Sequence, residues 1–303
     1  MRIGPDSYRE TIKIQYKSHM KKAGLHHLAG ILMSAMFHTS VFAQQEPTSG
    51  SLFIIGGGAR PVEMLERIIK ETGLCEGGYA MILPLASAER DSAIFYAKRQ
   101  FTNLGITNIS GLIYAEGESP LPRQIDSLKN ASLIYITGGD QDRFMQAIKN
   151  TPIGEAIHFN YQNGGMIAGT SAGAAIMSKD MITGTELRHP EYNSTFRHLE
   201  SENLELKDGL GLVENVIIDQ HFVRRSRYNR LLTAVIENPE IKGIGIDEAT
   251  AILIKGDEAE VVGDSQVIVF SNGNKSGNST DGKLSAKGII LDIYLNGDTF
   301  RLK

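Results

Sequence analysis

The sequence is poor in cysteine. Cys75 is the only one among 303 residues, which excludes an intramolecular disulfide framework and a Cys-rich zinc site. Apolar residues make up 41% and charged residues 22%, the balance of an ordinary soluble globular protein. The formal charge of −4 disfavours a general nucleic-acid binder. We recognise no spacing typical of metal ligands, so we expect no metal, no other cofactor and no effect of chelators on activity.

The first 43 residues differ from the rest in charge. They carry six basic and two acidic side chains, whereas residues 44–303 have a net charge of −8. From Met20 the pattern is typical of a secretory signal peptide: two lysines, an apolar run at 28–37 and a cleavage-type sequence, VFA, at 41–43. The apolar run is too short for a stable membrane span. We therefore expect a start at Met20 and a periplasmic or secreted protein; the alternative is an uncleaved cytoplasmic extension.

Residues 50–303 read as a single α/β domain, because short apolar runs alternate with amphipathic stretches and no linker separates them. Intervening helices of about 10–15 residues favour βαβ units and a parallel sheet. In such a sheet the reactive groups lie at the carboxyl ends of the strands. We expect strands of this pattern at 52–55, 79–85, 106–114, 133–137 and 166–168, and another strand at 213–218.

The C-terminal third has a different pattern. Four short apolar runs without helices between them, at 244–247, 250–254, 259–262 and 266–270, predict a C-terminal β-meander. The polar stretch 179–208 predicts a long irregular excursion near the site, and 271–282 predicts a polar loop.

The sharpest signal is the pentapeptide Gly169-Thr170-Ser171-Ala172-Gly173, a G-x-S-x-G pattern between an apolar strand and a helix-forming run. The turn is tight, so a Cβ at either flanking glycine would collide with the neighbouring strand or helix. Such a turn presents the Ser171 hydroxyl as a nucleophile and leaves the Ala172 N–H free to bind an oxyanion. The alternative is a Gly-rich turn that only packs closely or binds a phosphate.

Two further glycine turns follow predicted strands. Gly138-Gly139-Asp140 offers the backbone N–H of Gly139 as a second oxyanion donor, or is a simple strand-end turn. Gly56-Gly57-Gly58 lacks the spacing of a dinucleotide-binding fingerprint, and no Walker lysine follows it. We interpret it as a wall of the substrate site or, in preference, as a plain turn.

A serine nucleophile needs a base, and His221 is the best candidate, since it follows an apolar run at a strand's carboxyl end. His158 lies on a predicted helix, and His189 and His198 lie in the polar excursion, where surface positions are expected. A third group should orient the imidazole. Its candidates are Asp219, Asp247 and Glu248, and the residues alone do not choose among them.

Four arginines fall within seven residues, at positions 224, 225, 227 and 230. In an otherwise acidic chain, a guanidinium cluster beside a base indicates recognition of carboxylates. The alternative is a solvated helix face.

Five motifs follow one another along the chain: GGGAR (56–60), GGDQ (138–141), GTSAGA (169–174), DQHFVRRSRYNRL (219–231) and GIGIDEATA (243–251). In this order they resemble the serine peptidase family that contains cyanophycinases and aspartyl dipeptidase E. The resemblance covers about 52–270 and implies a flavodoxin-like, class I glutamine amidotransferase-like three-layer α/β sandwich. It implies Ser171 as nucleophile, His221 as base and Glu248 as orienting acid. It also implies six substrate-binding residues, without Arg224: Gln141, Asp219, Gln220, Arg225, Arg227 and Arg230.

The implied activity is hydrolysis of cyanophycin, an aspartate polymer with arginine on each β-carboxyl, to β-Asp-Arg dipeptides. Arginines would bind substrate carboxylates, and an acid such as Asp219 would meet the substrate guanidinium. The alternatives are an aspartyl or isoaspartyl dipeptidase and a non-catalytic relative that binds an acidic polymer. Serine in place of cysteine disfavours an amidotransferase. Family members are often dimers, so a homodimer is an expectation of the resemblance.

Overall fold

The computed structural model describes residues 50–114, 118–191 and 195–303. The predicted leader, its start at Met20 and its cleavage site lie outside these described residues. Within them, none of the helices has both the length and the apolar character needed to cross a bilayer.

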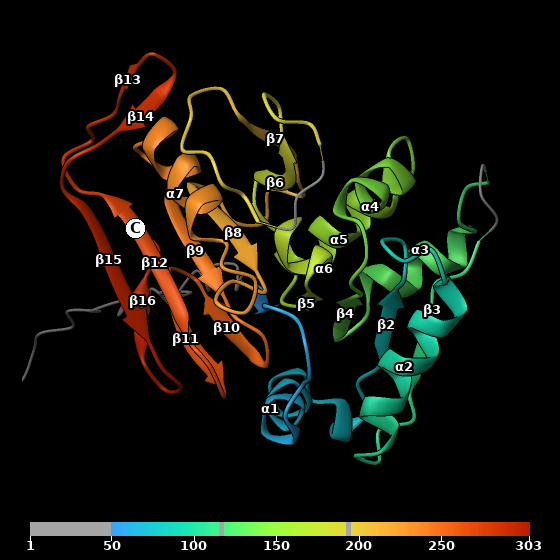
Figure 1. The fold of residues 1–303 in the computed structure, drawn as a ribbon. Coiled ribbons are helices and arrows are strands. Elements are labelled where there is room, and N and C mark those ends of the chain that lie inside the picture. Colours follow the sequence, from blue (N-terminus) through green and yellow to red (C-terminus); the bar gives the residue numbers. More distant parts are fainter. Residues whose placement is uncertain (1–49, 115–117, 192–194) are drawn as a thin grey trace, which may run out of the picture. The chain divides into compact units, whose positions relative to one another are not determined.

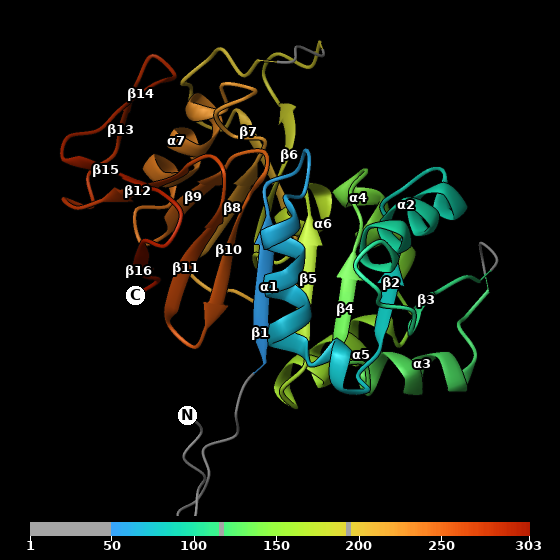
Figure 2. The ribbon, with the colours of Figure 1, turned by 90° about the horizontal axis from the view of Figure 1, so that it is seen from below.

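The centre of the fold is an eight-stranded sheet whose parallel part follows the predicted βαβ units (Figures 1 and 2). Its five parallel strands lie in the order β1-β5-β4-β2-β3. All residues of β2, β4 and β5 are buried, which explains why these strands read as continuous apolar runs. The bounds are β1 Ser51–Ile55, β2 Ala80–Leu83, β3 Ile109–Gly111, β4 Leu133–Ile136 and β5 Met166–Thr170.

Helices cover both faces of this sheet. On one face, Phe53 and Ile55 share a core with residues of α1 and α2; on the other, Leu52 and Ile54 share a core with residues of α3 to α6. The predicted three-layer α/β class is confirmed. The helices are α1 Val62–Thr72, α2 Arg90–Thr102, α3 Pro122–Lys129, α4 Gln141–Ile148, α5 Ile153–Gln162 and α6 Ala172–Ala175, with a 3₁₀ turn at Leu74–Glu76.

The four C-terminal strands lie where predicted, but they are divided between two sheets and do not form one meander. β10 and β11 form a hairpin that extends the central sheet from β1, with β16 at its edge, whereas β9 and β12 join a second sheet of order β15-β12-β9-β8. Helix α7, Tyr228–Glu237, connects β8 to its parallel neighbour β9 and packs directly on it at Gly243. The bounds are β8 Val216–Gln220, β9 Lys242–Ile246, β10 Thr250–Lys255, β11 Glu258–Gly263, β12 Val267–Asn272, β15 Ile289–Tyr294 and β16 Thr299–Arg301.

The excursion over 179–208 is more regular than predicted. It contains two antiparallel strands, β6 Asp180–Glu186 and β7 Leu204–Asp208, whose register shifts between Ile182 and Glu186. Polar side chains and this shift hide the two-residue period of a strand. A short hairpin of β13, Asn278–Thr280, and β14, Lys283–Ser285, likewise begins within the predicted polar loop.

Candidate active site

Ser171 stands on a strained turn between β5 and α6. Its φ of 55° and ψ of −112° lie in a region that residues other than glycine rarely adopt. A Cβ on Gly169 would lie 2.2 Å from the Gly173 oxygen, and one on Gly173 would lie 2.6 Å from the Ile136 oxygen. The predicted reason for the flanking glycines is therefore confirmed. The turn is anchored by the Ser171 N–H, which donates to the Ile55 oxygen at 3.0 Å.

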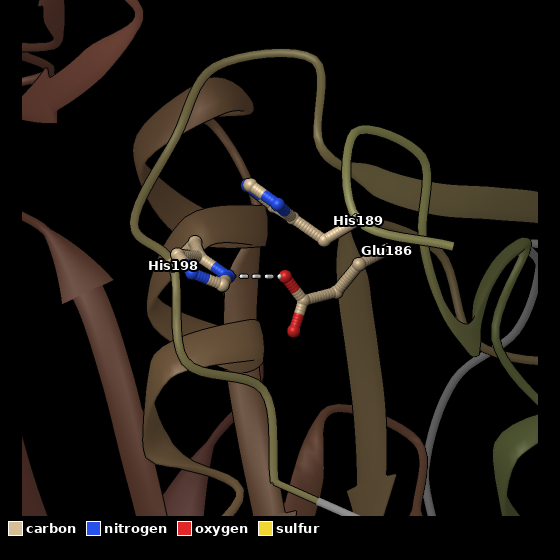
Figure 3. A group of neighbouring side chains, drawn as sticks. All are labelled: Glu186, His189 and His198. Atoms are coloured by element: carbon tan, nitrogen blue, oxygen red, sulfur yellow. Dashed lines mark hydrogen bonds and ion pairs between the residues drawn. The ribbon is translucent and has the colours of Figure 1, made fainter. Parts of the chain in front are cut away.

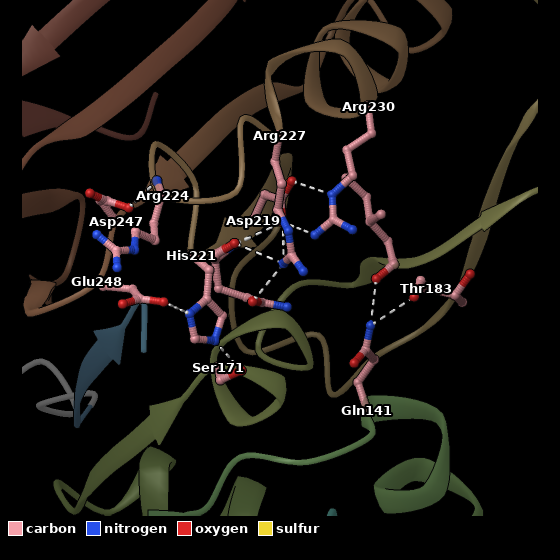
Figure 4. Close-up of polar contacts among 12 residues, drawn as sticks. Gln141, Ser171, Thr183, Asp219, His221, Arg224, Arg227, Arg230, Asp247 and Glu248 are labelled. Atoms are coloured by element: carbon pink, nitrogen blue, oxygen red, sulfur yellow. Dashed lines mark hydrogen bonds and ion pairs between the residues drawn. The ribbon is translucent and has the colours of Figure 1, made fainter. Parts of the chain in front are cut away.

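The structure brings the serine, the histidine and one carboxylate into line (Figure 4). The Oγ of Ser171 lies 2.9 Å from Nε2 of His221, and Nδ1 of His221 lies 2.6 Å from Oε1 of Glu248. The His221 side chain is 10% exposed, whereas Glu248 is 31% exposed. His221 follows β8 and Glu248 follows β9, so both come from the second sheet. A hydroxyl, an imidazole and a carboxylate in this order are the arrangement of serine hydrolases.

The two other candidates for the orienting acid, Asp219 and Asp247, have partners other than His221. Asp219 binds Arg230 through both carboxylate oxygens. Asp247 accepts the backbone N–H of Arg224 at 2.8 Å and the hydroxyl of Ser265 at 2.7 Å. The geometry thus favours Glu248 as the group that orients the imidazole.

The glycine turn at 56–58, interpreted by preference as a plain turn, holds both the imidazole and the acid. The His221 N–H donates to the Gly56 oxygen at 2.7 Å, and the Ala249 N–H donates to the Gly57 oxygen at 2.9 Å. A Cβ on Gly57 would lie 2.4 Å from Cε1 of His221, and one on Gly58 would lie 2.7 Å from Cβ of Glu248. Only glycine permits this approach. The sequence feature that could have indicated this role is the run of three glycines at a strand's carboxyl end.

The surroundings of His221 keep its imidazole neutral. Burial is the largest effect and lowers its pKa below the usual value, and the positive charges of Arg225 and Arg227 act in the same direction. The hydrogen bond to Glu248 opposes them without reversing the net shift. A neutral imidazole is the form that can accept a proton from Ser171.

This shift predicts the acid limb of the pH profile. Because a protonated His221 accepts no proton, kcat/KM should fall as the pH drops through the pKa of the folded enzyme, with a midpoint below about 6.5. Arg225→Gln removes one exposed positive charge and should move the midpoint to higher pH, whereas Arg224→Gln serves as the matched control. A wild-type midpoint above 6.5 would contradict this assignment.

Only part of the guanidinium cluster is a solvated face, because Arg227 and Arg230 are held by other side chains. Arg230 and Asp219 form a buried ion pair, with exposed fractions of 7% and 1%. The Nη1 of Arg227 donates to the main-chain and side-chain oxygens of Gln220 at 2.8 and 2.7 Å. Arg224 and Arg225 are both exposed, so exposure does not distinguish the omitted arginine from the predicted substrate-binding one. Asp219 is buried against Arg230, and its expected contact with a substrate guanidinium stays a prediction.

Gln141 lies at the first turn of α4, across from the arginines (Figure 4). Its amide nitrogen donates to the carbonyl oxygens of Ile182 and Thr183 at 2.9 and 3.2 Å. On the same strand, a Cβ on Gly184 would lie 3.1 Å from Nη1 of Arg230. Strand β6, which the sequence did not reveal, therefore joins the Gln141 side of the site to the arginine side.

Of the two predicted oxyanion donors, Ala172 follows Ser171 directly at the start of α6 and is 1% exposed. The other, Gly139, follows Gly138, on which a Cβ would lie 3.3 Å from Cβ of Ser171. Gly139 follows with φ 143°, and its own Cβ position lies 2.1 Å from the Ala86 oxygen, so the turn requires glycine. The donor roles of Ala172 and Gly139 stay predictions.

Removing Arg230 should affect stability as well as activity. Arg230→Ala leaves the buried Asp219 carboxylate without its principal partner, which typically costs about 3–5 kcal/mol of folding free energy. Arg227→Ala, which loses the Gln220 contacts, should mainly raise KM or lower kcat/KM. Urea unfolding and steady-state kinetics separate the two effects, with exposed Arg224→Ala as control. Wild-type stability in Arg230→Ala would contradict the buried pair.

Comparisons with known proteins agree with the class that fold and site define, a peptidase on a three-layer α/β scaffold. Residues 52–262 match the model of Peptidase family S51, and the chain belongs to that family. It is 32% identical to the cyanophycinase of Nostoc sp. over 267 residues, covering 85% of this chain and 87% of that protein. The cyanophycinase of Geminocystis herdmanii is also 32% identical, over 84% of this chain and 94% of that protein.

A crystal structure titled as a peptidase from an acI-B1 Actinobacterium aligns with a TM-score of 0.62 at 25% identity, over 84% of this chain and 98% of that chain. A putative peptidase E protein from Listeria monocytogenes aligns with a TM-score of 0.51 at 22% identity, over 72% and 100% of the two chains, which concerns the fold alone.

Proposed function

We propose that this chain is a serine-type exopeptidase that hydrolyses cyanophycin to β-Asp-Arg dipeptides. The observation that carries the proposal is the line from Ser171 through His221 to Glu248 with Arg225, Arg227 and Arg230 beside it. The substrate class comes from the relatives named cyanophycinase, which match along most of the chain.

The first half of the proposed reaction acylates Ser171. Its Oγ attacks the scissile carbonyl carbon while the hydroxyl proton passes to Nε2 of His221, 2.9 Å away. Glu248 holds Nδ1–H and stabilises the imidazolium that forms. The N–H groups of Ala172 and Gly139 receive the oxyanion. When the tetrahedral intermediate collapses, the C–N bond breaks and His221 gives its proton to the leaving amine.

The second half releases the acyl group. Water attacks the ester carbonyl and gives a proton to the neutral His221, and the C–O bond to Ser171 then breaks as the proton returns to Oγ. The enzyme is regenerated, and one peptide bond and one water have become a carboxylate and an amine. No other reactant is needed.

The arginines are proposed to recognise carboxylates of the polymer. Arg227 and the exposed Arg225 lie close enough to His221 for their charges to affect its pKa, so a substrate carboxylate bound there would lie beside the reacting bond. Buried Arg230 is fixed by Asp219, and these two act as the rigid support of the cluster. A small acidic dipeptide needs fewer cations, so the cluster disfavours the dipeptidase alternative.

The test is digestion of insoluble cyanophycin by the purified chain, with mass spectrometry of the soluble products. We expect β-Asp-Arg to appear with the wild type and to be absent with Ser171→Ala. Isoaspartyl and aspartyl dipeptides are assayed in parallel. Cleavage of these dipeptides with intact polymer would identify a dipeptidase instead, and binding of polymer without cleavage of any of the three would identify a non-catalytic relative.

We further propose export, on the basis of the sequence pattern at 20–43. Cell fractionation should find the protein in the periplasm or medium, lacking its first 43 residues, and in the cytoplasm when 20–43 are deleted.

A homodimer stays a prediction of the resemblance, and light scattering of the purified chain tests it.

A further inference from the structure

A second cluster of ionisable side chains lies apart from the catalytic line, at the end of β6. Glu186 closes that strand, His189 follows it, and His198 returns from the connection to β7 (Figure 3). One donor atom from each of the three lies within 4.8 Å of the other two. The proposed mechanism uses none of them. The sequence placed both histidines in an irregular polar stretch, where no ligand spacing was visible.

The contacts inside the cluster pair each imidazole with a carboxylate. Nδ1 of His198 lies 2.8 Å from Oε2 of Glu186, and Nε2 of His189 lies 2.8 Å from Oε2 of Glu200. The two rings stack with centroids 3.8 Å apart. Two imidazole nitrogens and the Glu186 carboxylate thus meet in one place, and the Glu200 carboxylate contacts His189. This donor set suits Zn²⁺ better than Mg²⁺ or Ca²⁺, which prefer oxygen alone.

The Glu186 carboxylate is held in position from behind. It is 9% exposed and accepts the side-chain amide of Asn203 at 3.1 Å and the backbone N–H of Arg197 at 3.2 Å. Asn203 is fully buried, and its own oxygen accepts the N–H of Arg188 at 2.9 Å. Metal-binding carboxylates are typically fixed by such outer hydrogen bonds. Although burial opposes ionisation, these bonds with that from His198 lower the pKa of Glu186, so it is a carboxylate at neutral pH.

We propose that Glu186, His189 and His198 form a zinc site, with Glu200 as the fourth ligand. Bonds of about 2.0–2.2 Å place tetrahedral ligands about 3.4 Å apart, so small side-chain rotations bring the donors of Glu186, His189 and His198 onto one ion. Glu200, which contacts His189, turns toward the ion as the fourth ligand. The ion takes the place of the hydrogen atoms between the imidazoles and the two carboxylates, and these protons pass to the solvent on binding. The charge of the ion offsets that of the carboxylates. Four protein ligands leave no open position for substrate, which makes the site structural.

Zinc at this place would tie the end of β6 to residues 198–200. The same strand accepts the Gln141 amide through Ile182 and Thr183. The ion would therefore fix a strand that borders the catalytic site without taking part in the chemistry. This inference departs from the expectation of no metal, and it stands whether or not the proposed substrate is correct.

The experiment measures Zn²⁺ binding to the full chain after dialysis against a chelator, by calorimetry and by the thermal unfolding midpoint. We expect one Zn²⁺ per chain, a rise in the unfolding midpoint with added Zn²⁺, and weaker binding at low pH, because protons compete with the metal for its ligands. His189→Asn and His198→Asn should each weaken binding at least tenfold, and Asn203→Ala should weaken it about 10–100-fold.

Control variants, the stability of each metal-free variant and Co²⁺ substitution test the proposed site further. His158→Asn changes a half-buried histidine outside the cluster, and Ser171→Ala changes the catalytic line; both should bind Zn²⁺ as the wild type does. The metal-free midpoint of each variant shows whether it folds. If the cluster variants do not fold, Co²⁺ in the wild type decides, since a tetrahedral site gives intense visible absorption. No Zn²⁺ binding to the wild type, wild-type affinity in both cluster variants, or a pale octahedral Co²⁺ spectrum would overturn the site.

Discussion

Ser171→Ala should lower turnover by a factor on the order of 10⁶, because the variant has no oxygen to form the acyl-enzyme. The fold should persist: alanine has the same Cβ as serine, so the strain at φ 55° is unchanged, and the Ser171 N–H bond to Ile55 is kept. Urea unfolding should therefore give a wild-type free energy, and polymer should still bind.

The control for this change is Ser110→Ala, an exposed serine on β3 far along the sheet order from β5. Its turnover should match the wild type. Near-normal turnover by a folded Ser171→Ala variant would remove the serine from the role of nucleophile.

His221→Ala should lower kcat by about 10³ or more, since the hydroxyl then loses the group that accepts its proton. The loss of kcat should be specific to His221 and should not follow from replacing another histidine. His158→Ala, which removes a half-buried histidine from α5, should accordingly leave kcat unchanged.

Combining the changes sharpens this second prediction. Ser171→Ala and His221→Ala act on one proton transfer, so the double variant should be little worse than Ser171→Ala alone. If His221→Ala reduced kcat only a few-fold, another base would have to serve Ser171. The parallel change Glu248→Gln should preserve the fold and lower kcat, because it removes the charge that stabilises the imidazolium.

The parallel strands of the core and the turn that carries Ser171 were predictable because their sequence patterns are local. Continuous apolar runs mark buried parallel strands, and the glycines at 169 and 173 are demanded by close contacts that any such turn makes. The pairing of the later strands was not predictable, because apolar runs show where strands lie and not which neighbours they take. That choice depends on contacts between segments distant in the chain, such as the pairing of β10 with β1.

The residues of the catalytic line were likewise predictable only in part. Position at strand ends singled out Ser171 and His221, but proximity in sequence gave no way to choose Glu248 over Asp219 and Asp247. The structure distinguishes them through partners: Asp219 lies against Arg230, and Asp247 caps the backbone of Arg224. The roles of Gly57 and of strand β6 escaped notice because both depend on tertiary contacts, with the His221 ring in one case and the Gln141 amide in the other.

The central claim is that His221 makes the Ser171 oxygen reactive, and covalent labelling with a fluorophosphonate tests it most directly. The reagent forms a P–O bond with an activated serine and loses fluoride, and peptide mass spectrometry locates the adduct. We predict one adduct per chain, on Ser171, formed at a rate that falls with pH through the His221 pKa and that collapses in His221→Ala. An adduct on another residue, or equal labelling of Ser171 without His221, would contradict the account.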